Sequence, residues 1–437
     1  MKAMPYEKYK PANESWLHAL PEAWDQIRGR FVMAVNPPAR RARALDDTDE
    51  VSFVPMEAVG EYGGLNLERT KPLDEIGSGY TAFEDGDVVI AKITPCFENG
   101  KGAIASGLKN GVGFGTTELH VLRAGKHLDK QFLFYLTISH TFRMLGESEM
   151  YGAGGQKRVP PEFAKDFRIP LPPLDEQQTI ARFLNAKTAQ IDALVAQKRQ
   201  LICKLKEKRQ ALIASTVTRG LPPEAAKAAG LEPNPEMKDS GVDWLGQIPK
   251  HWTAKAVRYI FRNCDSRRIP LSSEERADLE KLYPYYGASG VIDMVDDYLF
   301  DEPLVLVAED GANLLSRSTP LAFLATGKYW VNNHAHILKP LAGDIRYWVA
   351  TLETFDFSPL ITGAAQPKLT ADRLGGIQLP VPPPNEQATI ADYLAAKTGE
   401  LDALVGQAVE VVDRLTEYRQ ALITSAVTGK IDVRELA

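Results

Sequence analysis

Hydrophobic residues recur every three or four positions along two long stretches of the chain, residues 174–219 and 384–430. This spacing places them on one line of an α-helix and is typical of a seam between paired helices. A run of prolines, which cannot lie inside a helix, precedes a capping residue, Asp175 or Asn385, in each stretch. The sequence therefore predicts two long helices. Their predicted seam residues are Ile180, Leu184, Ile191, Leu194, Leu201, Leu205 and Leu212 in the first, and Ile390, Leu394, Leu401, Leu404, Val411, Leu415 and Leu422 in the second.

The two helical stretches are copies of one another. From Asp175 to Thr218 against Asn385 to Thr428, 24 of 44 positions are identical without a gap, at a constant offset of 210 residues. Weaker matches precede each copy, because Trp24 corresponds to Trp252 and the segment GAGGQKRV from Gly152 matches TGAAQPKL from Thr362. This pattern indicates a pseudo-twofold internal repeat of a globular domain followed by a helix.

Each predicted helix needs a partner for its apolar stripe, and the other copy is the expected one. Because each helix leads out of a domain, antiparallel pairing as a coiled coil would separate the two domains. At about 1.5 Å per residue, such a pair would form a spacer of roughly 65 Å. The alternative is that each helix packs on its own domain.

The segments before the helices alternate short β-rich runs with glycine-rich turns and one helical stretch each. We expect a mixed α/β (α+β) fold in both domains. The predicted organisation is a first domain over 1–173, a helix over 174–219, a Pro- and Ala-rich linker over 220–240, a second domain over 241–383, a helix over 384–430 and a tail over 431–437. The domain interiors hardly resemble each other, which suggests two modules that perform one task on different targets.

Composition restricts the function further. The chain has 437 residues, a formal net charge of -6 and three widely separated cysteines. The net charge argues against coating nucleic acid by bulk electrostatics, so a DNA contact would need a local basic surface. We find no long apolar run and no secretory signal, and expect a cytoplasmic protein. No motif of a hydrolase, metal site or nucleotide-binding loop is present, and Asn36-Pro-Pro-Ala lacks the aromatic residue of an adenine methyltransferase. We predict no catalytic residue and no metal.

The duplicated frame resembles the specificity subunit of type I restriction-modification systems over nearly the whole chain. The resemblance is carried by Ile169-Pro-Leu-Pro-Pro-Leu-Asp-Glu-Gln and Leu379-Pro-Val-Pro-Pro-Pro-Asn-Glu-Gln, the junctions before the two helices. A third carrier, Gly86-Asp-Val-Val-Ile, is similar to the "G-D-I-L" core strand of that family. The second domain departs from this form with Pro303-Leu-Val-Leu-Val-Ala-Glu-Asp-Gly.

The resemblance implies two target-recognition domains, each of which reads one half of a bipartite site in double-stranded DNA. The helix pair would fix the unread gap and dock two methyltransferase subunits, and the complex would recruit restriction and translocase subunits. Methylation and cleavage would belong to these partners, which would use S-adenosylmethionine, ATP and Mg, while this chain would carry no cofactor and no catalysis. The alternative is a non-enzymatic protein–protein scaffold with two divergent binding domains.

Candidate DNA contacts are basic and amide side chains on glycine-rich loops, because Arg and Lys suit phosphate and guanine and Asn and Gln suit adenine. In the first domain they are Lys92, Asn99, Lys101, Gln156, Lys157 and Arg158. In the second domain they are Asn313, Arg317, Asn332, Asn333, His334, Gln366 and Lys368. Gln156 and Gln366 have an alternative role as caps or braces of the junction. For each of the other candidates, the alternative is an ordinary solvated loop residue, and for any single one of them this alternative is favoured.

Overall fold

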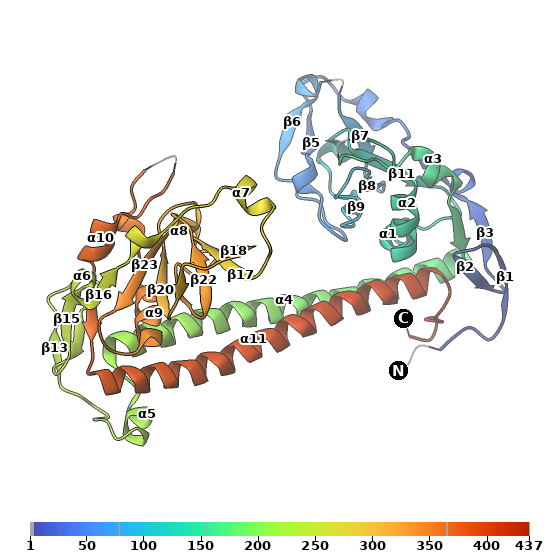
Figure 1. Cartoon of the computed structure of the whole chain (residues 1–437). Coiled ribbons are helices and arrows are strands. Elements are labelled where there is room, and N and C mark those ends of the chain that lie inside the picture. Colours follow the sequence, from blue (N-terminus) through green and yellow to red (C-terminus); the bar gives the residue numbers. More distant parts are fainter. Residues whose placement is uncertain (1–3, 78, 154, 364–365, 437) are drawn as a thin grey trace. The chain divides into compact units, whose positions relative to one another are not determined.

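A computed structural model of the chain contains both long helices and describes residues 4–77, 79–153, 155–363 and 366–436 (Figure 1). Helix α4 spans Leu174–Arg219 and helix α11 spans Pro384–Val427. The chain divides into two compact units. Unit 1 contains residues up to 199 and from 410 onward, and unit 2 contains residues 200–409. Each unit therefore holds one domain and one half of each long helix.

Within each unit the helix halves run antiparallel. In unit 1 the core joins the first turns of α4, at Ile180 and Leu184, to the last turns of α11, at Ile423 and Val427. In unit 2 the core joins the end of α4 to the start of α11, where Val217 and Ile390 are both fully buried. The arrangement confirms the pairing prediction, and each helix end also packs on a domain core.

The predicted seam is correct at the helix ends and wrong in the middle. Buried members are Ile180, Leu184, Ile191, Ile390, Leu394, Leu401 and Leu422, and half-buried ones are Leu205, Leu212 and Leu415. Four members are exposed instead, Leu194 by 38%, Leu201 by 42%, Leu404 by 48% and Val411 by 36%. A helix has about 3.6 residues per turn, so a strict seven-residue pattern drifts around it, and in α11 the buried line passes through Ala408 and Val412.

Two four-stranded sheets build the domain of unit 1. One has the order β4-β11-β8-β9 with all neighbours antiparallel, and the other has the order β6-β5-β10-β7 with β5 and β10 parallel. Two further pairs are β1-β2 and β3-β12. The strands are β1 Tyr9–Glu14, β2 Leu17–Pro21, β3 Asp25–Arg28, β4 Met33–Val35, β5 Glu50–Val54, β6 Thr70–Pro72, β7 Thr81–Glu84, β8 Val88–Ala91, β9 Gly102–Ile104, β10 Val112–Gly115, β11 Leu119–Ala124 and β12 Arg168–Leu171.

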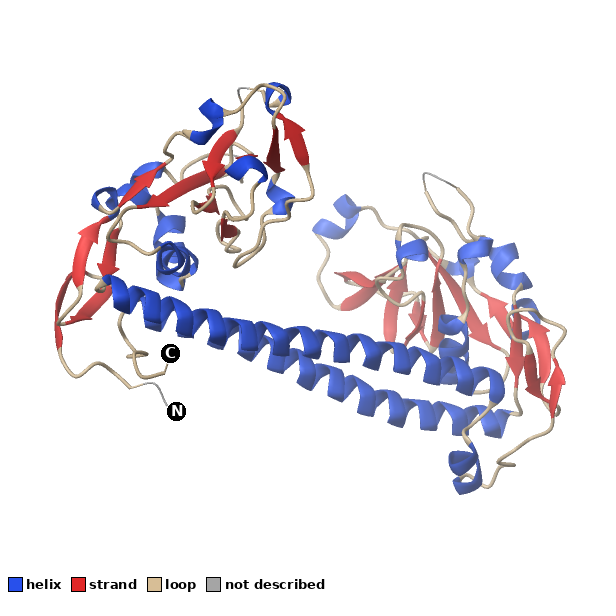
Figure 2. Ribbon diagram, turned by 180° about the vertical axis from the view of Figure 1, so that it is seen from behind, coloured by secondary structure: helices blue, strands red, loops and turns tan. Residues whose placement is uncertain are grey.

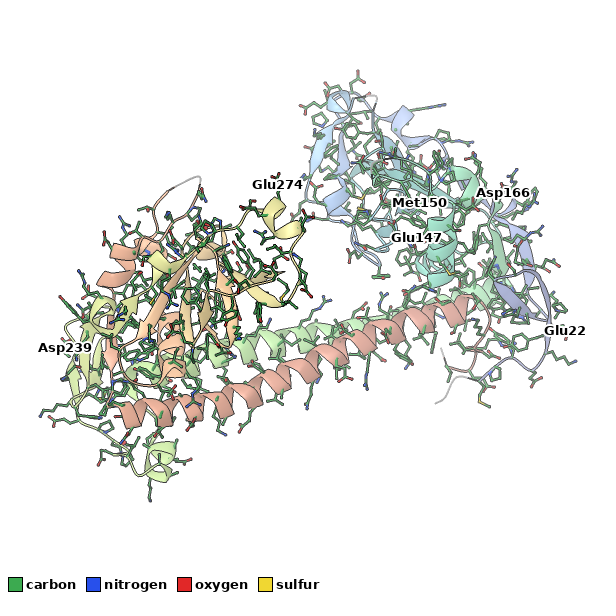
Figure 3. All side chains as sticks on the ribbon, in the orientation of Figure 1. Glu22, Glu147, Met150, Asp166, Asp239 and Glu274 are labelled. Atoms are coloured by element: carbon green, nitrogen blue, oxygen red, sulfur yellow. The ribbon has the colours of Figure 1, made fainter. Side chains whose placement is uncertain are left out.

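Three short helices accompany these sheets, α1 (Lys130–Ile138), α2 (His140–Ser148) and α3 (Pro161–Asp166). Asp129 caps α1 and Ser139 caps α2, each by accepting backbone N–H bonds with its side chain. Helix α3 ends at Asp166, which is labelled in Figure 3. Asp166 pairs with Arg30. All four residues of β8 are buried, as expected for an apolar run at the centre of a sheet that is covered on both faces.

Unit 2 repeats this topology although its domain sequence hardly resembles the first. Its sheets have the orders β16-β23-β20-β21 and β18-β17-β22-β19, again with one parallel pair, and the pairs β13-β14 and β15-β24 complete it. Figure 2 draws the strands of both domains in red. The strands are β13 Met237–Asp239, β14 Gln247–Pro249, β15 Thr253–Ala256, β16 Phe261–Asn263, β17 Tyr283–Gly287, β18 Gly290–Val295, β19 Phe300–Asp301, β20 Leu304–Ala308, β21 Ala322–Ala325, β22 Lys328–Val331, β23 Ala335–Pro340 and β24 Gln378–Val381. The helices are α6 Val257–Ile260, α7 Ser273–Ala277, α8 Asn313–Ser316, α9 Ile345–Thr354 and α10 Ala371–Gly376.

The segment predicted as a linker is packed against unit 2. It contains α5 (Pro223–Ala228) and strand β13, which pairs with β14. Leu221 and Ala226 belong to the core of unit 2, with exposed fractions of 9% and 2%. The proline and alanine content of this segment predicts a connector. Burial of its apolar side chains instead holds the segment on the core of unit 2. Among the described residues, no helix has the length and apolar character needed to cross a membrane.

Candidate nucleic-acid interface

Two equivalent loops, each shortly before one of the long helices in the sequence, carry candidate contacts. In unit 1 the loop closes where Tyr151 and Arg158 exchange backbone hydrogen bonds of 2.9 and 3.2 Å. In unit 2 Thr362 and Lys368 do the same at 2.8 and 2.9 Å. We call these the 151–158 loop and the 362–368 loop. Position 154 and positions 364–365 lie outside the described residues.

A glycine permits the tight closure of each loop. Gly152 and Gly363 have φ angles of +147° and +88°, which other residues rarely adopt. A Cβ atom on Gly152 would lie 2.4 Å from the carbonyl oxygen of Gln156, and one on Gly363 would lie 2.4 Å from that of Gln366. The side chains of Gln156, Lys157 and Gln366 are exposed, so the close turn presents amide and ammonium groups to solvent.

Both loops are fastened to the central strand of a sheet. Val159 donates its N–H to the carbonyl of Lys92, directly after β8, at 2.8 Å. Leu369 donates to the carbonyl of Glu309, directly after β20, also at 2.8 Å. The loops therefore stand at the same place on equivalent strands. They share an exposed glutamine, Gln156 or Gln366, and differ at the next position, where Lys157 corresponds to Pro367.

The basic residue at the base of each loop is already paired with a carboxylate. Arg158 donates to Glu118 with distances of 2.7 to 3.2 Å, and these hydrogen bonds hold the pKa of the Glu118 carboxyl below its usual value. Lys368 lies 3.1 Å from Glu309. A DNA phosphate would have to compete with these carboxylates. Arg158 and Lys368 are therefore weaker candidates than Lys157, which forms no ion pair with the residues that the structure describes.

The remaining candidates of the first domain differ in their availability. Lys101 donates its ammonium to the carbonyl of Met56 at 3.0 Å and is half-buried. Lys92 is half-buried, and its backbone rather than its side chain holds the 151–158 loop. Asn99 is exposed and lines a pocket of about 1060 Å³ in unit 1.

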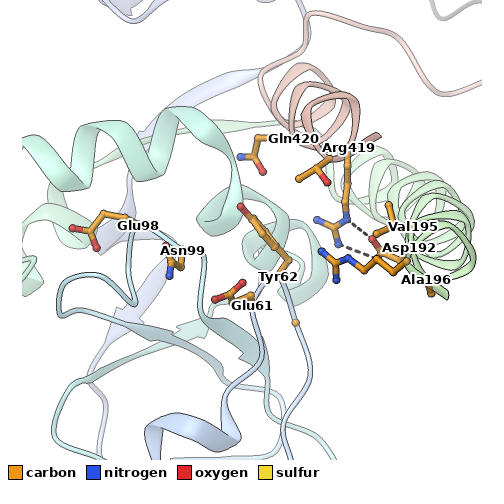
Figure 4. Close-up of a pocket in the computed structure, with 12 residues that line it drawn as sticks. Glu61, Tyr62, Glu98, Asn99, Asp192, Val195, Ala196, Arg419 and Gln420 are labelled. Carbon is orange, nitrogen blue, oxygen red and sulfur yellow. Dashed lines mark hydrogen bonds and ion pairs between the residues drawn. The ribbon is translucent and has the colours of Figure 1, made fainter. Parts of the chain in front are cut away.

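That pocket has a lining of mixed polarity and suits a phosphate poorly (Figure 4). Arg419 of α11 pairs with Asp192 of α4 at 2.9 Å and lies over the ring of Tyr62 at 5.1 Å. Two further acids, Glu61 and Glu98, also line the pocket, whose charged groups are two arginines, Arg199 and Arg419, and three carboxylates. The negative charge of the carboxylates opposes an anion, and Arg419 serves to hold the domain loop on the helices.

Five candidates of the second domain lie outside the 362–368 loop, and the side chains of three of them form hydrogen bonds with the backbone of the domain. Asn313 braces a turn, accepting from Thr319 N–H at 2.9 Å and donating to its carbonyl at 3.1 Å. Arg317 donates to the carbonyl of Phe355 at 2.9 Å, at the end of α9. Asn332 is only 4% exposed, which contradicts its prediction as an exposed loop contact, because the residue turns inward to accept from the His334 N–H. Asn333 and His334 are exposed, and His334 pairs with Asp310 at 2.8 Å.

Two buried histidines at the bases of the loops were missed in the sequence. His120 of β11 and His336 of β23 are each 2% exposed, and the Nε2 atom of each lies 2.8 Å from the carbonyl of Val159 or Leu369. The signal that could have found them is the recurrence of histidine before two apolar residues, as His-Val-Leu and His-Ile-Leu.

The second histidine belongs to a charged cluster with the residue types of a metal site. Ligand atoms of Asp265, Glu309 and His336 lie within 4.8 Å of one another. Arg268 already contacts Glu309 at 2.5 Å and Lys368 contacts it at 3.1 Å, so organic cations neutralise the carboxylate. The ring nitrogen of His336 lies at hydrogen-bond distance from Asp265, 2.6 Å. We therefore assign hydrogen bonding and ion pairing to this cluster.

Comparison with known proteins places this architecture in a family. Residues 78–203 and 249–407 match the model of the type I restriction modification DNA specificity domain, once in each repeat. The type I restriction enzyme EcoEI specificity subunit of Escherichia coli is 44% identical over 163 residues, 37% of this chain and 27% of the relative. The EcoAI specificity subunit of the same organism gives the same identity and coverage. The match thus spans about a quarter of these relatives.

Other similarities cover nearly the whole chain. The type I restriction enzyme MjaVIII specificity subunit of Methanocaldococcus jannaschii is 22% identical over 98% of both chains. A chain solved in a study of complex assembly and conformational transition of the type I R-M system has a TM-score of 0.70 at 18% identity, covering 94% of this chain and 99% of its own. The HsdS subunit from Thermoanaerobacter tengcongensis has a TM-score of 0.50 at 17% identity, covering 94% and 98%. These structures show a shared fold, and with the family model they establish that the chain belongs to the type I restriction modification DNA specificity family.

Proposed function

We propose that this chain reads a bipartite site in double-stranded DNA, with one half-site recognised by the domain of each unit. The observation that carries the proposal is that one fold occurs twice with different side chains on equivalent loops. Gln156 and Lys157 at one loop and Gln366 at the other are exposed and free to meet base edges or phosphates. The family match favours this function over a protein–protein scaffold.

The helix pair is proposed to set the unread gap between the half-sites. Each long helix is continuous, and one half of it lies in unit 1 while the other half lies in unit 2. Ion pairs at equivalent positions, Asp192 with Arg419 and Asp402 with Arg209, both at 2.9 Å, fix the register of the two helices. A fixed register gives a fixed spacer.

The exposed apolar residues in the middle of the helices support docking of two methyltransferase subunits. Leu194 and Leu201 of α4 are equivalent to Leu404 and Val411 of α11, and all four are exposed. Equivalent apolar positions on two repeats suit two copies of one partner. Methylation and cleavage are assigned to these partners and to restriction subunits, which would use S-adenosylmethionine, ATP and Mg in the cytoplasm. No catalytic role is assigned to this chain.

Methylation mapping tests the proposal directly. The chain is expressed with its methyltransferase partner in a host without adenine methylation, and methylated sites are read across the genome. We expect a two-part motif with a fixed gap. Gln156→Ala with Lys157→Ala should relax only one half of the motif, and Gln366→Ala only the other. Methylation that does not depend on this chain would contradict the proposal.

A further inference from the structure

The two buried histidines have different hydrogen-bond partners, although they occupy equivalent strands. The Nδ1 atom of His120 faces the side-chain amide nitrogen of Asn36 at 3.2 Å. The carbonyl oxygen of that amide already accepts from the Val121 N–H at 2.9 Å, so the nitrogen is a donor. His120 Nδ1 must therefore accept, and its Nε2–H donates to the carbonyl of Val159. These partners fit a neutral ring.

In unit 2 the hydrogen-bonding role of the asparagine side chain passes to an aspartate one residue further along, because Cys264 occupies the backbone position equivalent to Asn36. Asp265 accepts the Ile337 N–H with Oδ1 at 2.7 Å, as Asn36 does from Val121, and its Oδ2 lies 2.6 Å from His336 Nδ1. The other ring nitrogen faces the carbonyl of Leu369 at 2.8 Å. Both nitrogens thus face acceptors, and only a doubly protonated ring donates to both. These partners fit an imidazolium.

Other nearby charges differ in the same sense. The residue directly after the central strand is Lys92 in unit 1 and Glu309 in unit 2, and Glu309 lies 3.6 Å from His336 Nδ1. Two cations, Arg268 and Lys368, also contact Glu309 and offset its charge, so the direct contact with Asp265 is the interaction that most favours protonation of His336. Around His120 the charged groups are Lys92, Glu118 and Glu162, with Arg158 paired to Glu118.

We infer that His336 is held as an imidazolium and positions the 362–368 loop, whereas His120 anchors the 151–158 loop as a neutral ring. Asp265 is the residue that sets the difference, because it offers an acceptor where Asn36 offers a donor. The carbonyl anchored by His336 belongs to Leu369, the residue that follows the loop. Loss of the ring proton leaves one of the two acceptors without a partner and loosens the base of this loop alone.

The directions of the pKa shifts agree with the geometry. Burial by itself lowers the pKa of His336, but the hydrogen bonds to Asp265 and Leu369 and the charges of Asp265 and Glu309 outweigh it and raise the pKa above its ordinary value. Burial also lowers the pKa of His120, and there the hydrogen bond to Val159 does not restore it.

Histidine-labelled chain at full length tests the charge states. Long-range ¹H–¹⁵N spectra distinguish an imidazolium from each neutral tautomer, and His120→Gln and His336→Gln assign the two rings. At neutral pH we expect both nitrogens of His336 protonated and only Nε2 of His120 protonated. Asp265→Asn should turn His336 neutral, and the matched Asn36→Asp should turn His120 cationic. A neutral His336 in the unaltered chain would overturn the inference, whether or not the variants fold.

The loop-positioning role rests on the proposed DNA function and has its own readout. Half-site protection by the unaltered chain should weaken about two- to tenfold for the second half-site as the pH rises through the His336 pKa. Protection of the first half-site should not follow this titration. Asp265→Asn should remove the pH dependence. Confirmed charge states with pH-independent protection would overturn the positioning role, whereas absence of DNA binding at every pH would instead contradict the proposed function.

Discussion

The indole Nε1 of Trp24 donates a hydrogen bond of 3.0 Å to the buried carboxylate of Glu176, the third residue of α4. Trp252 makes the same bond, at the same length, to Glu386 near the start of α11. Each tryptophan belongs to the domain whose chain continues into that helix. The repeated bond therefore fixes the start of each long helix to its own domain.

Removal of this acceptor should destabilise unit 1. Glu176 also accepts from the Tyr6 hydroxyl at 2.7 Å, so Glu176→Ala leaves two buried donors without a partner. We expect a loss of roughly 2 to 3 kcal/mol in the free energy of unfolding, measured by chemical denaturation. Glu176→Gln keeps one acceptor oxygen and should cost less. Equal stability of the alanine variant and the unaltered chain would show that the bond does not hold the helix start.

A matched pair of leucines separates helix packing from partner docking. Leu401 is 8% exposed and Leu404 is 48% exposed on the same helix. Leu401→Ala should lower stability by about 2 to 4 kcal/mol, because it removes buried methyl groups. Leu404→Ala should change stability by less than about 0.5 kcal/mol and weaken binding of the methyltransferase partner, measured by calorimetry with purified subunits. Unchanged affinity for Leu404→Ala would argue against docking on this face.

The exposed lysine of the 151–158 loop should contribute to phosphate contact. Lys157→Ala is expected to weaken DNA binding at all sequences and to reduce the slope of log affinity against log salt by about one. Lys126→Ala is the matched control, because Lys126 is also exposed but lies near the start of α4. Its neighbour His127 is held there, since the His127 carbonyl accepts a hydrogen bond from the side chain of Gln177. An equal reduction of slope in both variants would indicate a general charge effect and not a contact of the loop.

The helix pair should determine the gap in the DNA site. Seven residues inserted after Ile202 in α4 and seven after Ala408 in α11 lengthen both helices at facing positions, as the Asp192–Arg419 and Arg209–Asp402 pairs indicate. The added length of about 10 Å corresponds to about three base pairs. Methylation mapping should show unchanged half-sites and a longer gap. An unchanged gap would contradict the proposal that the helix pair sets the distance between the half-sites.

The two histidines should give the units opposite responses to pH. The raised pKa of His336 means that its contribution to stability is present below about pH 6.5, the unfolded value, and is lost as the pH rises through its folded value. The lowered pKa of His120 means that its contribution is present above about pH 6.5 and is lost as the pH falls toward its folded value. Hydrogen exchange, corrected for intrinsic rates, should show β23 less protected at high pH and β11 less protected at low pH. Parallel responses in both strands would contradict this assignment.

The sequence alone determined the framework of the protein. Prolines before Asp175 and Asn385 placed the starts of both helices to within one or two residues, since α4 begins at Leu174 and α11 at Pro384 and neither predicted cap precedes its helix. The repeat with an offset of 210 residues indicated two equivalent modules. These features depend on local backbone chemistry and on duplication, and both can be recognised from the order of the residues alone. The exposed positions of Gln156, Lys157 and Gln366 also agree with the prediction, because polar residues in glycine-rich loops favour solvent.

The tertiary structure decided what each side chain contacts. Leu194 and Leu404 match the seven-residue pattern but are exposed, because the line of contact between two helices drifts relative to that pattern. Arg317 and Asn332 have the chemistry of DNA contacts but serve the fold, since their partners come from segments distant in sequence or from a local inward turn. The difference between His120 and His336 depends on Asn36 and Asp265, which lie 84 and 71 residues away in the chain. Contacts over such separations arise only when the strands are paired, so no local pattern predicts them.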